Sequence, residues 1–273
     1  MAFAPRAGGA RYGLEPIEVT SLLRTEQLSV RIGGRTLLEA LQMQLEPGEF
    51  VAVLGRNGCG KSLTMQTLAG LRPVDSGAVL LDERELGEWS RREVAQSIGV
   101  LPQDREESLP LTTLQTSLLG RHPHLDAWRM ESTQDHAIAA AALEQLGVAE
   151  HADRILTTLS GGEQRRAAMA SLLSQRPRVY LLDEPTNHLD PQHQIAVLDL
   201  FAGLCREGAA VIATLHDPAL ADRYAQRVLM MYGDGRWLLG ETRDILNARE
   251  LSALYLTPMC ELGVPGRRAF IPA

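Results

Sequence analysis

Long apolar runs, abundant cysteine and an excess of positive charge are all missing from this sequence of 273 residues. The stretch that comes nearest to a membrane span, residues 137–143, is far shorter than the roughly 18 to 20 residues that a helix needs to cross a bilayer. We therefore expect that the chain does not cross a membrane itself. The first residues lack the continuous apolar region of a secretory signal, and we expect residues 1–22 to form a mobile N-terminal tail.

The few cysteines and the net charge restrict the class of protein further. Cys59, Cys205 and Cys260 are an odd number without metal-ligand spacing, which fits a reduced cytosolic protein. The formal net charge of −7 disfavours a surface that follows nucleic-acid phosphates, so we expect no nucleic-acid partner. A hydrophobic content of 45% can fill one large core, as one domain or as one domain with an inserted subdomain.

A glycine-rich loop is the first chemical signal. It reads Gly-Arg-Asn-Gly-Cys-Gly-Lys-Ser at residues 55–62, between the β-forming residues 50–54 and the helix-forming residues 63–71. Glycines let such a loop point successive N–H groups at phosphate oxygens, beside the positive end of the next helix. Lys61 adds a point charge for the β- and γ-phosphates, and Ser62 offers a hydroxyl to Mg²⁺. A plain glycine turn with a solvated lysine explains this order of elements less well.

Alternating strand and helix patterns predict the rest of the fold. A mostly parallel sheet is expected, interrupted by a helical block over residues 111–158. The other expected strands are 79–81, 98–101, 178–183, 209–215 and a closing hairpin of 228–232 with 237–239, besides a β-like region over 23–48. The expected helices include about 133–146, a helix after 162 that runs to 175, one from about 191 and a terminal pair within 241–256.

Polar residues stand where the apolar strands of the second half end. Asp183 and Glu184 directly follow one expected strand, and His216 follows the next. Since the carboxyl ends of parallel strands meet at one edge of a sheet, these side chains are expected at the ligand-binding edge. An acid there can hold Mg²⁺, usually through water, while its neighbour faces the attacking water. Taken alone, Gln103 and His216 would be ordinary polar residues.

A second glycine motif, Leu-Ser-Gly-Gly-Glu-Gln at residues 159–164, leads into an expected helix, so its N–H groups form another anion-binding end. Together these motifs resemble, over residues 23–240, the ATP-binding subunit of ATP-binding-cassette (ABC) transporters. The matching segments, in order, are residues 55–62 (Walker A), Gln103 (Q-loop), 159–164 (signature), 179–184 (Walker B with the catalytic acid), 187–190 (D-loop) and His216 (switch histidine).

The resemblance implies an α/β fold, with a P-loop NTPase core on a mostly parallel sheet, an antiparallel β subdomain and an inserted α-helical subdomain. It implies one ABC ATPase domain over residues 23–256, with the helical subdomain at about 105–175, and leaves 257–273 as a C-terminal tail. The cofactors implied are ATP and Mg²⁺. The nucleotide-binding residues implied are Gly55, Arg56, Asn57, Gly58, Cys59, Gly60, Lys61, Ser62, Leu63, Ser160, Gly161 and Gly162.

The resemblance also implies how the site works. Two copies would pair head to tail, with ATP between Walker A of one and Ser160, Gly161 and Gly162 of the other. The expected catalytic residues are Glu184, which orients or deprotonates water, His216, which contacts the γ-phosphate, and Gln103, which links metal and water to the helical block. The expected metal residues are Ser62, Gln103 and Asp183.

A finer resemblance is to the subunits that serve importers of iron–siderophore, haem and vitamin B12 complexes. It rests on Leu-Gly-Arg-His-Pro-His-Leu at residues 119–125, and on residues 183–190 followed by His193 and Gln194. It implies integral membrane permease subunits as partners, a periplasmic or surface substrate-binding protein as an indirect partner, and a peripheral position on the cytoplasmic face of the membrane. His122 and His124 have no further ligand nearby, so we interpret them as interface or capping residues.

The chain departs from the family where adenine and the phosphates are bound. The family usually has an aromatic residue that stacks on adenine near Ile32, and this chain has none between Tyr12 and Phe50, so weak base selectivity is expected. Leu63 and Thr64 stand in reversed order relative to the family. Cys59, close to a helix N-terminus and to a lysine, is expected to be a reactive thiolate.

Other members of the superfamily are alternatives. An exporter subunit, or an importer subunit for another substrate, would carry the same motifs. A soluble ABC ATPase that acts on ribosomes or DNA is disfavoured, because such proteins carry two cassettes, zinc modules or long coiled coils. This sequence has one cassette, no cysteine cluster and no heptad run.

Overall fold

A six-stranded sheet forms the centre of the chain, which the computed structural model describes for residues 21–103, 110–125, 130–264 and 267–273. The strand order is β10-β9-β3-β8-β7-β6. Its strands are β3 (Phe50–Gly55), β6 (Ile98–Leu101), β7 (Val179–Leu182), β8 (Ala210–Thr214), β9 (Arg227–Met231) and β10 (Trp237–Glu241). Apart from the antiparallel β9–β10 hairpin, neighbouring strands are parallel, so their carboxyl ends meet at one edge.

A smaller antiparallel sheet covers part of the central one. Its order is β2-β1-β4-β5, with β1 (Leu23–Ile32), β2 (Arg35–Leu45), β4 (Ser76–Leu81) and β5 (Arg84–Glu85). Gly33 and Gly34 connect β1 to β2 with φ of 54° and 79°, a turn that requires two residues in the left-handed region. The expected antiparallel β region is therefore confirmed.

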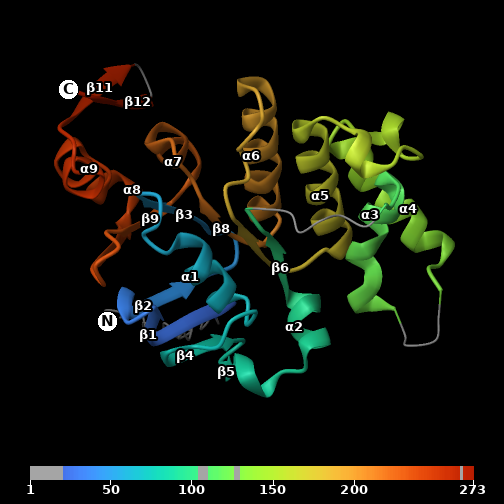
Figure 1. The fold of residues 1–273 in the computed structure, drawn as a ribbon, viewed down its shortest axis with the longest axis horizontal. Coiled ribbons are helices and arrows are strands. Elements are labelled where there is room, and N and C mark those ends of the chain that lie inside the picture. Colours follow the sequence, from blue (N-terminus) through green and yellow to red (C-terminus); the bar gives the residue numbers. More distant parts are fainter. Residues whose placement is uncertain (1–20, 104–109, 126–129, 265–266) are drawn as a thin grey trace, which may run out of the picture.

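Helices flank the central sheet and form a block of their own (Figure 1). In that block, α3 (Thr113–Leu118), α4 (Thr133–Gln145) and α5 (Gly161–Gln175) gather on the side away from β1 and β2. The remaining helices are α1 (Lys61–Leu68), α2 (Arg91–Ser97), α6 (Pro191–Arg206), α7 (Pro218–Tyr224), α8 (Thr242–Ile245) and α9 (Ala248–Tyr255). Short 3₁₀-helices occur at Leu86–Glu88, Leu119–His124, Ala149–His151 and Leu156–Thr158.

The hydrophobic core lies on both faces of the central sheet. In β3, Phe50, Ala52 and Leu54 pack into one core cluster with α5 and α6, while Val51 and Val53 pack into another with the antiparallel sheet and α1. Alternate residues of a strand point to opposite faces, so a strand buried on both sides is apolar throughout. This explains why the sequence shows continuous apolar runs before the polar motifs.

The C-terminal region is more ordered than the sequence suggested. Instead of a tail over residues 257–273, β11 (Met259–Val264) pairs with β12 (Arg267–Pro272) as an antiparallel hairpin. Phe270 is buried, and the Arg268 guanidinium binds the Asp222 carboxylate on α7. Alternating side chains therefore attach the hairpin to the domain. Of the expected N-terminal tail, residues 1–20 lie outside the described part of the chain.

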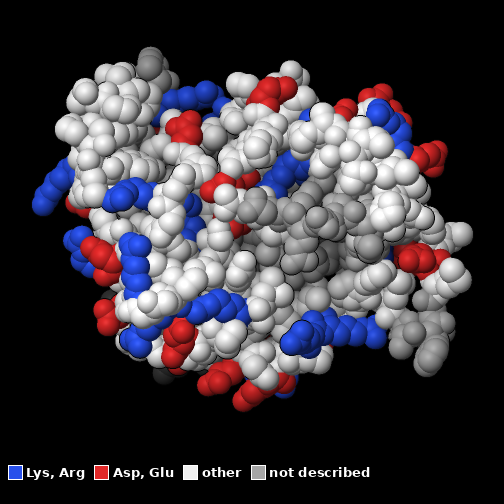
Figure 2. Space-filling model, viewed as in Figure 1, with Lys and Arg blue, Asp and Glu red and all other residues white. Residues whose placement is uncertain are grey.

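Two further expectations concern surface and membrane. Within the described residues, no helix combines the length and apolarity required to cross a bilayer. On the face seen in Figure 2, basic and acidic side chains are interspersed over the antiparallel sheet and the C-terminal helices. The described residues on this face thus form no continuous basic patch.

Candidate functional site

The glycine-rich loop connects the end of β3 to the start of α1, as the sequence predicted. Gly60 caps α1 with a left-handed φ of 104°, and a Cβ there would lie 2.9 Å from Leu37, so only glycine fits. Lys61 is 6% exposed, and its Nζ donates to the carbonyls of Gly55 at 2.8 Å and Arg56 at 3.3 Å. The ammonium is therefore held against the loop at the N-terminal end of a helix.

A cavity of about 500 Å³ opens beside this loop. Several residues expected to bind nucleotide line it together with two expected catalytic residues, and these are Asn57, Gly58, Gly60, Lys61, Ser62, Leu63, Gln103 and Glu184. Among the residues that the structure describes, the lining does not include Ser160, Gly161 or Gly162. One chain thus brings the Q-loop and Walker B residues to the phosphate loop, but keeps its own signature motif apart.

The two acids lie at the carboxyl end of β7 and are both buried. The Thr214 hydroxyl, at the end of the neighbouring β8, donates to Oδ1 of Asp183 at 2.7 Å and accepts from the backbone N–H of Glu184 at 2.7 Å. Sequence reasoning missed Thr214. The sequence did hold a signal for it: Thr214 is the single polar residue at the end of the apolar strand β8, and β8 pairs with β7, which is followed directly by Asp183 and Glu184.

Glu184 has partners for both carboxylate oxygens. Nε2 of His216 lies 2.7 Å from Oε1, and the side-chain amide of Asn187 donates to Oε2. The backbone of Glu184 has φ of 50°, in the left-handed region that a non-glycine residue adopts at a cost of about 1–3 kcal/mol. The structure thus holds this acid in one orientation toward the cavity, as a residue that orients water requires.

The three residues expected to hold a metal come together. Ser62 Oγ donates to Oε1 of Gln103 at 3.2 Å, and both residues line a second cavity of about 860 Å³ with Asp183. In the described part of the chain, no group of three or more His, Cys, Asp or Glu side chains could hold a metal ion. Hydroxyl, amide and carboxylate oxygens suit Mg²⁺, which in nucleotide sites takes its remaining ligands from phosphates and water. The residues therefore fit a magnesium ion that arrives with a nucleotide.

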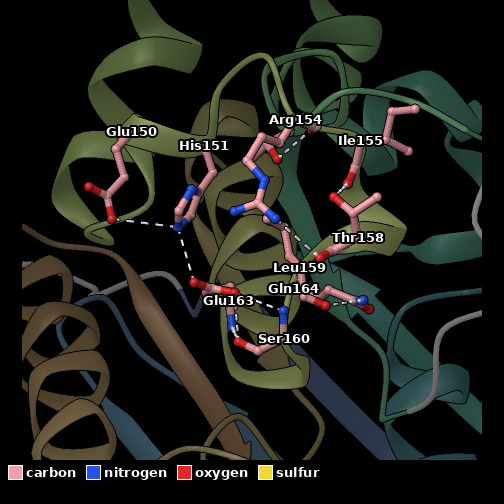
Figure 3. A network of polar contacts seen from close by, with 10 residues as sticks. Glu150, His151, Arg154, Ile155, Thr158, Leu159, Ser160, Glu163 and Gln164 are labelled. Atoms are coloured by element: carbon pink, nitrogen blue, oxygen red, sulfur yellow. Dashed lines mark hydrogen bonds and ion pairs between the residues drawn. The ribbon is translucent and has the colours of Figure 1, made fainter.

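The signature motif forms the N-terminus of α5 (Figure 3). The backbone N–H and hydroxyl of Ser160 both donate to Oε2 of Glu163 at 2.7 Å, and Oε1 of Glu163 lies 3.0 Å from Nε2 of His151. Hydrogen bonds from Ser160 lower the pKa of Glu163 to about 2, with a smaller contribution from His151. Ser160 and Glu163 form a capping box, which fixes the first turn of α5. The backbone N–H groups of this first turn lie at the positive end of the helix, where an anion can bind.

Cys59 corrects an expectation. The side chain is 3% exposed and belongs to the core cluster on the antiparallel-sheet side. Burial raises the pKa of this thiol, and the nearby charges of Lys61 and Arg56 offset the effect only in part. The prediction of a reactive thiolate is therefore wrong, because desolvation outweighs the helix terminus and the lysine.

The structure agrees with the earlier interpretations of Ile32 and His124. Ile32, 53% exposed, lines the cavity beside the phosphate loop with Arg35, and the described lining contains no aromatic side chain. Weak base selectivity therefore stays a prediction. Nε2 of His124 lies 2.7 Å from the carbonyl of Gln175, the last residue of α5, which is the contact of a capping residue.

Comparison with known proteins settles the family. The family model described as ABC transporter matches residues 38–187. The chain belongs to the ABC transporter family. Membership confirms the α/β P-loop fold and makes the chain an ATP-binding subunit that hydrolyses ATP.

Proteins similar to this chain align with it over most of their length. The chain is 39% identical to the hemin import ATP-binding protein HmuV of Pseudomonas aeruginosa, over 86% of this chain and 92% of that protein. It is 35% identical to the ferric enterobactin transport ATP-binding protein FepC of Escherichia coli K12, over 87% of this chain and 88% of that protein. A solved structure of a putative metal-chelate type ABC transporter in an inward-facing conformation matches with TM-score 0.81 and 29% identity, over 93% of this chain and 98% of that chain.

Proposed function

We propose that this ABC ATPase is the energy-coupling subunit of an importer for a metal chelate, of the class of iron–siderophore, haem or cobalamin complexes. The observation that carries the proposal is the likeness, over nearly the whole chain, to ATP-binding subunits named for hemin import and for ferric enterobactin transport. The likeness to a metal-chelate type transporter structure supports the same class of cargo.

Within the site, each held side chain has a role in hydrolysis. Glu184 orients or deprotonates the attacking water, and its contacts with His216 and Asn187 support this role because they fix the carboxylate. The His216 side chain is 44% exposed, which supports a contact with the γ-phosphate as well. Lys61 balances the charge of the β- and γ-phosphates at the start of α1.

Ser62, Gln103 and Asp183 would hold Mg²⁺ together with the phosphates, as their shared cavity supports. The ion would neutralise charge that builds up on the phosphate oxygens during transfer. Because Gln103 is hydrogen-bonded to Ser62, binding of Mg²⁺ and nucleotide at the start of α1 would also change the contacts of Gln103.

A head-to-tail pair of chains completes the site. The N-terminus of α5, with Ser160, Gly161 and Gly162, is an anion-binding end that lies outside the chain's own cavity, so it is available to the ATP of a second copy. ATP would close the pair, and hydrolysis would release it. The free energy of ATP binding and hydrolysis is what an importer converts into movement of its membrane subunits.

The membrane permease docks, we infer, between the helical block and the core. The cavity of about 860 Å³ supports this, because its lining combines residues of α1, α3 and α5 with Gln103. A short helix of the permease inserted there would contact the Q-loop directly. The chain would then lie peripherally on the cytoplasmic face of the membrane, and a periplasmic or surface substrate-binding protein would act on it only through the permease.

Uptake by a reconstituted transporter tests the proposal. The chain would be co-purified with its permease, placed in proteoliposomes with ATP on its own side, and assayed with haem, a ferric siderophore and cobalamin. ATP-dependent accumulation of one of these, lost in Lys61→Ala, is the expected result. Outward movement of cargo would indicate an exporter, and a chain that hydrolyses ATP but binds no permease would indicate a soluble ABC ATPase.

A further inference from the structure

Arg165 joins three catalytic motifs through one buried guanidinium group. The residue lies in the second turn of the signature helix α5 and is 6% exposed. Its Nη1 and Nη2 donate to four backbone carbonyls, those of Pro102 at 2.5 Å, Gln103 at 3.2 Å, Asp183 at 2.5 Å and Glu184 at 3.0 Å. The Q-loop and the Walker B acids thus meet on a side chain of the helix that carries the signature.

The carbonyl of Glu184 is the most consequential of the four. Glu184 has φ of 50°, and a non-glycine residue keeps such a conformation only where its surroundings impose it. Two donors impose it here, the backbone N–H of Asn187 at 3.2 Å and the guanidinium of Arg165 at 3.0 Å. The direction of the Glu184 side chain therefore depends in part on Arg165.

Arginine suits this position in a way that lysine and glutamine do not. A guanidinium has five N–H donors in a rigid plane, so it can serve carbonyls from two chain segments at once. A lysine ammonium is a compact point charge on a flexible stem, and a glutamine amide has only two donors. Without the guanidinium each of these carbonyls would lose one donor, and the Q-loop and the end of β7 would no longer be held by the same side chain.

We propose that Arg165 is a positioning residue that ties the signature helix to the catalytic acid. Its guanidinium holds the backbone carbonyls of Gln103 and Glu184 at fixed positions relative to α5, so that a movement of α5 displaces both residues together. The inference rests on the proposed roles of Glu184 and Gln103. In a pair of chains, closure of the signature helix on the partner's ATP would in this way reach the water-orienting acid of the same chain.

Loss of Arg165 has a specific kinetic consequence. The four carbonyls that Arg165 binds belong to the Q-loop and to Asp183 and Glu184, whereas Lys61 is held by the carbonyls of the phosphate loop, so ATP affinity is expected to change much less than turnover. The position of Glu184 relative to the attacking water changes, and a misplacement of about 1 Å can cost about 10²-fold in rate. The expected result is a fall in kcat without a matching change in the Kd for ATP.

The experiment uses the full chain with ATP and Mg²⁺, and compares wild type with Arg165→Gln, Arg165→Lys, Glu184→Gln and the double variant of Arg165→Gln with Glu184→Gln. Phosphate release gives kcat, and equilibrium binding of a fluorescent ATP analogue, competed with ATP, gives Kd. Arg249→Gln is the control for loss of a positive charge, because Arg249 on α9 has a side chain that is 93% exposed. Arg165→Gln is expected to lower kcat by about 10²-fold, with Arg165→Lys between it and wild type.

The double variant distinguishes positioning from general stability. If Arg165 acts through Glu184, removing it from the Glu184→Gln protein lowers kcat no further, because coupled residues are not additive. A further drop of the same size as in wild type would overturn the proposal, and so would an Arg165→Gln protein with unchanged kcat. If Arg165→Gln does not fold, Arg165→Lys and its double variant are compared in the same way.

The same measurements separate this inference from the proposed function. A wild-type chain that neither binds nor hydrolyses ATP would contradict the function itself. A wild type that hydrolyses ATP, together with Arg165 variants that match it, would contradict only the role of Arg165.

Discussion

Nε2 of His216 lies 2.7 Å from Oε1 of Glu184, and the two residues follow neighbouring parallel strands, β8 and β7. The carboxylate is 7% exposed and the imidazole 44% exposed, so the histidine reaches a buried acid from the open side of the site. This contact fixes one carboxylate oxygen while the Asn187 amide fixes the other. The arrangement leaves the acid little freedom to rotate away from an attacking water.

Removing the histidine tests this arrangement. In His216→Ala the Oε1 atom of Glu184 loses its partner and the γ-phosphate loses a contact, so turnover is expected to fall by about 10²-fold. ATP binding, which depends on the phosphate loop, is expected to persist. Steady-state phosphate release and equilibrium ATP binding measure the two effects. A variant that loses binding and turnover in parallel would show that His216 supports the fold of the site and not the chemical step.

The capping box of α5 predicts a pH dependence of stability. In the folded chain the hydrogen bonds from Ser160 hold the pKa of Glu163 at about 2, below its value in an unfolded chain. The carboxylate therefore adds stability above about pH 4.5, and this contribution is lost as the pH falls toward about 2. Glu163→Gln is thus expected to melt below wild type at neutral pH, with a difference that shrinks as the pH falls.

Thermal melts between neutral and acidic pH measure that difference. Glu144→Gln, an exposed position on α4, is the matched control for the loss of one carboxylate. A gap between wild type and Glu163→Gln that stays constant down to the acid limb would contradict the role assigned to the ionised form.

Two threonines of α1 form a matched pair for stability. Thr64 and Thr67 are each 1% exposed, and the Thr67 hydroxyl donates to the carbonyl of Leu63 at 2.8 Å. In the described structure the Thr64 hydroxyl is buried without a hydrogen-bond partner. Thr64→Val should therefore stabilise the chain by about 1 kcal/mol and Thr67→Val should destabilise it by about 1 kcal/mol. Urea unfolding followed by circular dichroism measures both, and equal effects of the two substitutions would contradict the assignment.

Thiol chemistry should single out the C-terminal hairpin. Cys260 is exposed, whereas Cys59 and Cys205 are buried, and burial raises the pKa of Cys205 to about 12. N-ethylmaleimide is therefore expected to label Cys260 first and to leave ATP hydrolysis intact, since the thiolate is the reactive form. Peptide mapping by mass spectrometry identifies the labelled residue, and Cys260→Ala should remove the rapid phase. Rapid labelling of Cys59 with loss of hydrolysis would contradict the burial of the phosphate-loop thiol.

Much of the site was predictable because its signals are local in the sequence. A glycine loop between a strand and a helix, and acids directly after an apolar strand, predict where phosphates and a metal ion meet. The structure places Lys61, Gln103 and Glu184 around one cavity, as expected. The parallel order of the strands makes this possible, since each polar residue follows a strand that ends at the same edge.

Other features depend on contacts between segments that are distant in sequence, so no local sequence pattern predicts them. From the sequence alone Arg165 resembles a solvated helix residue, whereas in the structure the Q-loop and the end of β7 pack against α5 and bind its guanidinium. The burial of Cys59 depends on packing around the loop, where Gly233 approaches it closely. The C-terminal hairpin is held by Arg268 and Phe270 against α7, which is remote in sequence.

The most direct test of the account is the turnover of Glu184→Gln in the full chain. The substitution keeps the size of the side chain but removes its ability to accept a proton, so phosphate release is expected to fall by at least about 10²-fold while ATP still binds. Size-exclusion chromatography with ATP and Mg²⁺, with the permease present where the pair needs it, should then show an ATP-bound pair of chains that wild type does not accumulate. A Glu184→Gln protein that releases phosphate at the wild-type rate would contradict the central role given to this acid.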